Sequence, residues 1–143
     1  FIEAVKREGY EAIAICFLFS FKNASHELAA ADYISARLPG IAIAQSHQVS
    51  PEWREFERTS TTVMDSYLAP VVRKYLETLV GNLKNRLPEG QGLHVMESNG
   101  GVMSAASASQ TPLQTLLSGP VGGAVGGHRP TQSDLCGYGR HIL

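Results

Sequence analysis

Residues 12–19, Ala-Ile-Ala-Ile-Cys-Phe-Leu-Phe, form an unbroken apolar run rich in β-branched and aromatic side chains. This pattern predicts a strand that is covered on both faces, as in parallel sheets. Asn23 can cap a following helix over residues 24–38, where apolar residues recur near helical spacing until Pro39-Gly40 ends it. Residues 41–44, Ile-Ala-Ile-Ala, predict a second short strand. A strand, a helix and a strand with short connections indicate an α/β fold with parallel strands.

The composition is that of one globular domain. The chain has 143 residues, of which 43% are hydrophobic, and it can bury a core. Its formal charge is -1, from 12 basic and 13 acidic residues, so we expect neither nucleic acid nor a membrane as a partner. Cys16, Cys136 and the five histidines show no paired or ligand spacing, which predicts no metal site and favours a cytoplasmic setting. The first residue is Phe1 and no signal peptide follows, so we expect a piece of a longer polypeptide.

Residues 59–62, Thr-Ser-Thr-Thr, lie in a predicted long helix. This helix follows a loop at residues 46–51, between Gln45 and Glu52, and is capped by Ser50 before Pro51. Hydroxyl-rich segments are poor helix formers, so two interpretations are open. The hydroxyls face a ligand or an interface, or they bond back to the preceding turn. Residues 63–83 continue the helix with an apolar stripe, and Pro70 should kink or divide it.

Two glycine-containing segments follow. Residues 97–101, Glu-Ser-Asn-Gly-Gly, come directly after a third predicted strand at residues 93–96. Ligands bind beyond the carboxyl ends of strands in open α/β sheets, although Asn-Gly is also a common hairpin signal. In residues 115–127, Ser118, Gly119 and Pro120 suit the start of a helix, where free N–H groups favour an anion. Close packing of a glycine-rich helix is the alternative.

Taken in order, four segments resemble the hydantoinase A / 5-oxoprolinase family, which includes the acetone carboxylase β-type subunits. These segments are residues 57–63, 67–71, 97–101 and 116–123. The resemblance covers residues 1–127 and implies part of an ATPase fold similar to actin, Hsp70 and the sugar kinases, with a short, mostly parallel sheet and a long helix. It implies an enzyme that uses ATP and Mg²⁺ to activate a cyclic amide or ketone carbonyl for ring-opening hydrolysis or carboxylation, together with a B-type subunit.

The match also implies which residues line the nucleotide cleft: Ser98, Asn99, Gly100, Gly101, Ser118, Gly119 and Pro120. Candidates for a substrate or subunit interface are Arg58, Thr59, Thr62 and Asp65, where the family commonly has asparagine at position 65. No catalytic residue is identified. The phosphate loops of the family, Asp-x-Gly-Gly-Thr, do not occur in this chain, so we expect an internal fragment that does not turn over ATP alone. Residues 128–143 depart from the family pattern, and we expect an irregular, frame-shifted or disordered tail.

Two other functions stay open. One is a non-catalytic structural or subunit-docking module, in which residues 59–62 and the stripe of residues 63–83 cover a partner. The other is a metabolite kinase of the same superfold, which would need phosphate loops outside this chain. The sequence does not distinguish hydantoin, 5-oxoproline and ketone substrates.

Overall fold

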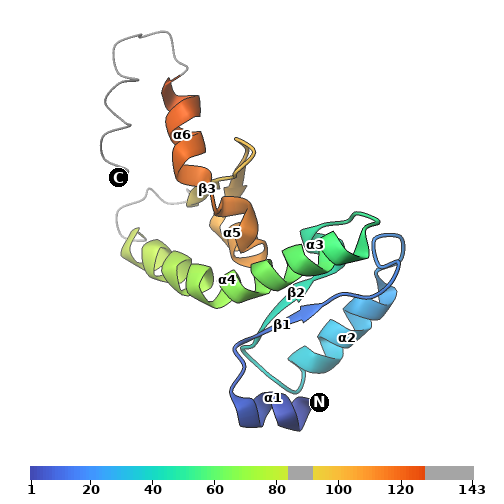
Figure 1. Cartoon of the computed structure of the whole chain (residues 1–143). Helices are drawn as coiled ribbons and strands as arrows, with labels where there is room; N and C mark the ends of the chain where they lie inside the picture. Colours follow the sequence, from blue (N-terminus) through green and yellow to red (C-terminus); the bar gives the residue numbers. More distant parts are fainter. Residues whose placement is uncertain (84–91, 128–143) are drawn as a thin grey trace.

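The computed structural model describes residues 1–83 and 92–127 (Figure 1). The helices are α1 (Ile2–Glu8), α2 (Ser25–Ser35), α3 (Ser46–Val49), α4 (Glu55–Leu83), α5 (Ala105–Gln110), the 3-10 helix η1 (Pro112–Thr115) and α6 (Ser118–Gly127). The strands are β1 (Ala12–Ile15), β2 (Ala42–Gln45), β3 (His94–Met96) and β4 (Val102–Ser104). Within these ranges, every helix is too short or too polar to cross a membrane.

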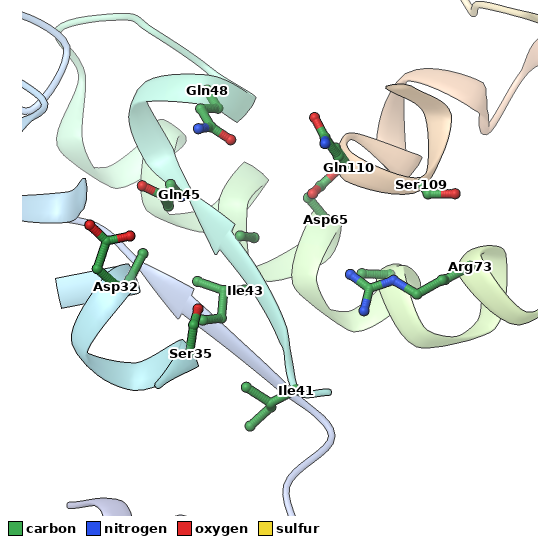
Figure 2. A pocket seen from close by; sticks show the side chains of 13 residues that line it. Asp32, Ser35, Ile41, Ile43, Gln45, Gln48, Asp65, Arg73, Ser109 and Gln110 are labelled. Atoms are coloured by element: carbon green, nitrogen blue, oxygen red, sulfur yellow. The ribbon is translucent and has the colours of Figure 1, made fainter. Parts of the chain in front are cut away.

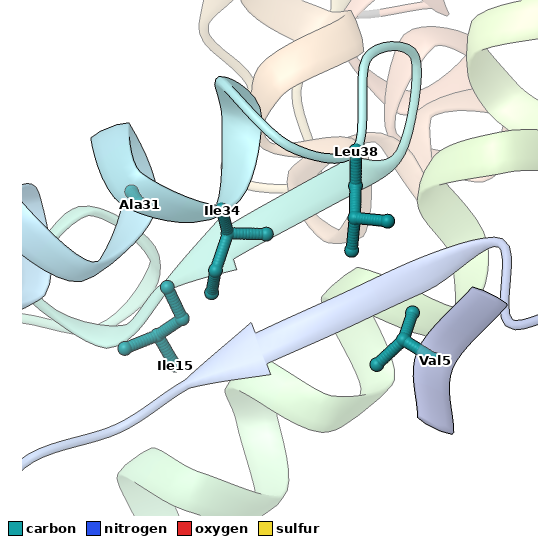
Figure 3. Packing of buried hydrophobic residues seen from close by; sticks show 5 residues of the cluster. All are labelled: Val5, Ile15, Ala31, Ile34 and Leu38. Carbon is teal, nitrogen blue, oxygen red and sulfur yellow. The ribbon is translucent and has the colours of Figure 1, made fainter. Parts of the chain in front are cut away.

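The first third of the chain confirms the predicted α/β unit. β1 and β2 pair in parallel, with Ala12 opposite Ala42 and Ile15 opposite Gln45. Figure 1 places this strand pair between α2 and α4, and α4 packs against both strands. The hydrophobic core gathers residues from α1, β1, α2 and the turn after α2 (Figure 3): Val5, Ile15, Ala31, Ile34 and Leu38.

β1 is shorter than the predicted strand, which extended to residue 19. The ladder ends at Ile15, because two side chains from elsewhere take the backbone groups of Phe17. Glu27 Oε1 accepts a hydrogen bond from the Phe17 N–H at 2.9 Å, and Arg58 Nη2 donates to the Phe17 carbonyl oxygen at 2.7 Å. Phe17 and Leu18 are 44% and 74% exposed, so the apolar run beyond Ile15 is not buried by the described residues.

The predictions for the loop at residues 46–51 and for the start of the next helix were wrong. Ser46–Val49 is the short helix α3, and α4 begins at Glu55 rather than after a cap at Ser50. The carboxylate of Glu27 caps α3 by accepting hydrogen bonds from the Ser46 hydroxyl and the His47 N–H. A cap that comes from a different helix leaves no local sequence signal.

α4 is one helix of 29 residues with Pro70 inside it, so Pro70 does not divide it. Its ribbon bends along its length in Figure 1, as expected where proline removes a helical hydrogen bond. The buried residues of α4 are mostly polar or small: Arg58, Thr62, Asp65, Ser66, Ala69 and Leu76. By contrast, Val63, Tyr67 and Val71 are 50%, 80% and 70% exposed. We call these three residues the α4 apolar face.

β3 does not join the parallel pair. It pairs antiparallel with β4 in a separate two-stranded sheet, with His94 opposite Ser104. The third predicted strand is therefore present, but it does not extend the parallel pair. Residues 97–101 form the turn of this hairpin, in which Gly100 has φ 91°. The hairpin interpretation of Asn-Gly therefore holds. The predicted tail at residues 128–143 lies outside the described residues.

Candidate functional site

A polar cluster occupies the carboxyl ends of β1 and β2, with the carboxylate of Glu27 at its centre. Glu27 is fully buried, and its Oε1 accepts hydrogen bonds from the Phe17 N–H at 2.9 Å and the Ser46 hydroxyl at 2.6 Å. Its Oε2 accepts a bond from the His47 N–H at 3.0 Å and lies 2.8 Å from His47 Nδ1. The Ser20 hydroxyl lies 2.9 Å from Ser46 Oγ. One carboxylate from α2 therefore fixes the end of β1 and the start of α3.

The environment of Glu27 keeps its carboxylate charged. Burial raises the pKa of Glu27, but the hydrogen bonds from Ser46, His47 and Phe17 outweigh burial and lower the pKa to about 2. A charged carboxylate only accepts hydrogen bonds, so Nδ1 of His47 carries a proton. Glu27 therefore positions backbone and side-chain donors and does not supply a proton.

Arg58 begins the predicted interface segment on α4, and the structure buries it. Its side chain is 1% exposed, with Nη1 donating to the Glu52 carbonyl oxygen at 2.9 Å and Nη2 donating to that of Phe17 at 2.7 Å. The nearest carboxylate oxygen in the described part is Glu55 Oε1, at 3.9 Å from Nη2. Nε has no hydrogen-bond partner among the described residues. Arg58 is thus a buried cation held mainly by uncharged carbonyl oxygens, which favours an anion beside it.

The hydroxyl-rich segment of α4 divides into two roles. Ser60, Thr61 and Thr62 each donate to the carbonyl oxygen four residues earlier, at 2.9, 2.8 and 2.7 Å, as the back-bonding interpretation predicted. Thr59 differs, because its hydroxyl donates to Cys16 Sγ at 3.0 Å, just beyond the end of β1. The structure therefore brings Arg58 and Thr59 to the carboxyl end of β1, whereas Thr62 is buried within its own helix.

Asp65 lies about two turns further along α4 and lines a cavity of about 340 Å³ between α2, β2, α4 and α5 (Figure 2). Oδ1 accepts a hydrogen bond from the Leu113 N–H at 2.9 Å, which ties α4 to η1. Oδ2 has no partner within the described ranges. Burial raises the pKa of Asp65 and outweighs the opposing Leu113 hydrogen bond. A raised pKa favours the neutral acid, which offers a donor beside an acceptor, as an asparagine amide does.

The loop of residues 98–101 lies against the start of α6. The Ser98 hydroxyl donates to the Gln114 carbonyl oxygen at 2.8 Å and accepts from the Leu117 N–H at 3.2 Å. Asn99 Oδ1 accepts a hydrogen bond from the Gly101 N–H at 2.7 Å, and Asn99 Nδ2 donates one to Glu97 Oε2 at 3.0 Å. Ser98 thus joins this loop to the chain immediately before Ser118.

The glycines of this region have different surroundings. A Cβ on Gly100 would lie 3.8 Å from the side chains of Val121 and Val125, so this loop packs directly on α6. In α6, apart from the adjacent residues and the backbone of the helix itself, no described atom lies within 4 Å of the Cβ position of Gly119, Gly123 or Gly126. The positive φ of 91° accounts for Gly100, and a Cβ on Gly101 would lie only 3.0 Å from Asn99 Oδ1, whereas neither reason applies to Gly119. Pro120 lies in the first turn of α6, where its missing N–H removes no helical bond.

The predicted site residues form separate groups rather than one. Arg58 and Thr59 lie at the end of β1, Asp65 lines the cavity, and residues 98–101 lie at the start of α6. Across residues 1–83 and 92–127, no three His, Cys, Asp or Glu side chains lie close enough to hold a metal ion.

Sequence reasoning missed the central role of Glu27. Its signal is its spacing with the core residues Ala31, Ile34 and Leu38, because positions separated by three or four residues share one face of a helix.

Comparison with known proteins identifies the relatives of this chain. The family described as hydantoinase/oxoprolinase matches residues 58–137, a range that begins at Arg58 and includes α6. The α subunit of caprolactamase from Pseudomonas jessenii is 34% identical over 119 residues, which cover 83% of this chain and 17% of that protein. The 5-oxoprolinase of Saccharomyces cerevisiae is 31% identical over 125 residues, which cover 87% of this chain and 9% of that protein.

Two solved structures share the fold of this chain. The crystal structure of the ATP-dependent caprolactamase from Pseudomonas jessenii matches with a TM-score of 0.74 and 34% sequence identity. The match covers 85% of this chain and 18% of the caprolactamase chain. The nucleotide-free structure of acetone carboxylase, from work on ATP-dependent acetone carboxylation, matches with a TM-score of 0.73 and 27% sequence identity. The match covers 87% of this chain and 18% of the acetone carboxylase chain. The chain therefore spans less than a fifth of the length of these proteins.

Proposed function

Because this chain belongs to the hydantoinase/oxoprolinase family, we propose that it is part of an enzyme that uses ATP to activate the carbonyl group of a cyclic amide or a ketone. Activation prepares that carbonyl for ring-opening hydrolysis or for carboxylation. The observation that carries this proposal is the similarity of the chain, over most of its length, to an ATP-dependent caprolactamase. The ATPase fold similar to actin, Hsp70 and the sugar kinases belongs to the same proposal, with residues 1–127 as one part of it.

We place the nucleotide phosphates beside the loop of residues 98–101 and the first turn of α6. Ser98 holds this loop at the amino end of α6, where the helix dipole favours negative charge. The open space beside Gly119 leaves room for a phosphate next to the main chain. When bound, ATP would supply a phosphoryl group to the carbonyl oxygen, with ADP as the leaving group, and Mg²⁺ would accompany the phosphates. We propose that the carboxylates for Mg²⁺ and the other phosphate loops lie elsewhere in the complete protein.

The names of the relatives support a second subunit. The caprolactamase relative is a subunit alpha, and an acetone carboxylase relative from Xanthobacter autotrophicus is a beta subunit. We propose that the complete protein works in the cytoplasm with a B-type subunit. Thr59, which is exposed, and Asp65, which lines the cavity, remain our candidates for contacts with substrate or with that subunit, whereas Arg58 and Thr62 are buried by the described residues.

A docking module without catalysis is the second candidate function. The α4 apolar face favours it, because three large side chains on one helix are left without cover by the described residues. The metabolite-kinase alternative has no comparable support in the structure. Nucleotide binding distinguishes the first two candidates, since only the enzyme needs the open space at Gly119.

The test compares two glycines of α6 in the 143-residue chain, with circular dichroism as the folding control. We expect Gly119→Ala to weaken ATP binding measured by titration calorimetry, because its methyl group enters the phosphate position. Gly126→Ala is the matched control, since it has the same open surroundings at the other end of α6, and it should bind as the unchanged chain does. Equal weakening by both variants, or no weakening by either, would favour the docking module. We also expect no ATP turnover by the chain alone.

A further inference from the structure

The cavity between α2, β2, α4 and α5 has acceptor groups in its walls that the described residues leave without donors. Asp65 Oδ2 and Gln45 Oε1 are buried atoms with no hydrogen-bond partner in the described part, and both residues line this cavity. Asp65 is only 1% exposed, so bulk water does not replace its missing donor. A buried acceptor without a donor costs folding free energy. The cavity therefore favours a ligand that brings N–H or O–H groups to it.

A positive charge borders the same space. Arg73 lines the cavity, is half-buried, and extends from α4 toward β2 in Figure 2. Among residues 1–83 and 92–127, no carboxylate oxygen lies within 4.0 Å of its guanidinium nitrogens. Asp32 also lines the cavity, but it is exposed, so water screens its charge. The walls thus offer one cation and two acceptors, which together suit a ligand with charges of both signs.

The spacing of the lining residues along α4 determines the shape of this ligand. Asp65, Ala69 and Arg73 are four residues apart, so they lie on one face of the helix. At a rise of about 1.5 Å per residue, Asp65 and Arg73 are about 12 Å apart along the helix axis. Ala69 is small and buried between them, and Ile43 of β2 adds an apolar side chain to the wall. A short hydrocarbon segment therefore fits between two charged ends.

We propose that this cavity binds an ω-amino carboxylate, a small molecule with an ammonium group and a carboxylate at opposite ends of a hydrocarbon chain. The ammonium group donates to Asp65 Oδ2, and the carboxylate pairs with Arg73. Burial raises the pKa of Asp65, and an ammonium group at Oδ2 would favour the charged carboxylate again. The volume of about 340 Å³ lies within the roughly 300–1000 Å³ of small-molecule sites. Of the described residues that line the cavity, none belongs to the loop of residues 98–101 or to α6, so this inference does not depend on ATP binding.

The experiment titrates the isotope-labelled 143-residue chain with δ-aminovalerate, without nucleotide, and follows the backbone amides by NMR. We expect saturable shifts at Ala44 and Ala69, which lie in the wall of the cavity. N-acetyl-δ-aminovalerate lacks the ammonium group and should bind at least about tenfold more weakly, because it loses a charge-assisted hydrogen bond. Glycine, whose two charges lie on adjacent carbons, should also bind more weakly. No binding of δ-aminovalerate, or equal binding of all three molecules, would overturn the proposal.

Three single variants assign the two ends of the ligand, with circular dichroism as the folding control. Asp65→Asn keeps an acceptor for the Leu113 N–H but removes the charge, and it should weaken δ-aminovalerate binding at least about tenfold. Arg73→Gln should weaken δ-aminovalerate similarly, but it should not weaken the methyl ester, which lacks the carboxylate charge. Lys74→Gln is the matched control, because Lys74 is an exposed cation outside the cavity lining, and its binding should not change. Unchanged binding by Asp65→Asn, or equal binding by Arg73→Gln and Lys74→Gln, would overturn the proposal.

Discussion

Replacing Glu27 by glutamine tests whether one buried charge organises the carboxyl ends of β1 and β2. Glutamine keeps the shape of the side chain, but it removes the charge and places an amide N–H₂ group where one carboxylate oxygen accepted hydrogen bonds. The fold lowers the pKa of Glu27 from its ordinary value near 4.5 to about 2. Each pKa unit corresponds to roughly 1.4 kcal/mol, so the charged form contributes about 3 kcal/mol to folding.

The sign of the pH dependence follows from the lowered pKa. The Glu27 contribution is complete above about pH 4.5 and is lost as the pH falls toward 2, where the folded state also takes up the proton. We therefore expect the unchanged chain to be more stable than Glu27→Gln by about 3 kcal/mol near neutral pH, and this difference to shrink toward zero in acid.

Urea unfolding followed by circular dichroism at a series of pH values measures this difference. Glu57→Gln is the matched control, because the Glu57 side chain is 59% exposed and its removal should change the free energy of unfolding little at any pH. The reasoning fails if the curves of free energy against pH are parallel for the unchanged chain and Glu27→Gln. A loss near neutral pH no larger than that of Glu57→Gln would refute it as well.

Two further substitutions follow from the described hydrogen bonds. Asp65→Asn should be at least as stable as the unchanged chain near neutral pH, because the fold raises the pKa of Asp65 and the charged form therefore costs stability once the pH exceeds the pKa of the unfolded chain. Thermal unfolding at acidic and at neutral pH measures this difference. A variant less stable than the unchanged chain at both pH values would contradict the prediction. Ser98→Ala removes the two bonds of the hydroxyl group, to the Gln114 carbonyl oxygen and from the Leu117 N–H, while the bond from the Ser98 backbone N–H to Gln114 stays, and it should cost about 1–2 kcal/mol locally. Faster amide exchange at Leu117 would report the loss, and an unchanged exchange rate would show that the loop is held by other contacts.

The parallel strand pair could be predicted because its information is local. The apolar run of residues 12–15 forms β1 itself. α2 lies within the predicted range of residues 24–38, although it ends at Ser35, before Pro39-Gly40, and its N-cap is Ala24 rather than Asn23. Asn23 Oδ1 accepts from the Ser25 N–H at 3.0 Å, and Gly9 ends α1 with φ 70°, as a helix-ending glycine does.

The errors in the fold prediction share a physical origin in long-range contacts. The early end of β1 and the helix α3 both depend on the Glu27 carboxylate, which lies 10 residues from Phe17 and 20 from His47. Arg58 reaches Phe17 over 41 residues. Such side chains replace backbone partners, and no local pattern of hydrophobicity or propensity reports them.

The candidate site was predictable only in part. The resemblance to the family identified Arg58, Thr59 and the loop of residues 98–101, but it could not show that Thr59 faces Cys16 while its neighbours bond back along α4. That difference depends on where β1 ends relative to the helix, which is a property of the packed structure. The role of each residue toward nucleotide or substrate stays a prediction.

The unpaired edge of β1 and the α4 apolar face affect how the isolated chain behaves in solution. In the described part, β1 pairs with a strand on one side only, and the neighbouring Val63, Tyr67 and Val71 side chains meet water. An unpaired strand edge beside exposed hydrophobic side chains favours association between copies of a chain as the concentration rises. We expect the isolated polypeptide to self-associate in this way, so binding constants should be measured on dilute samples whose mass in solution has been checked by light scattering.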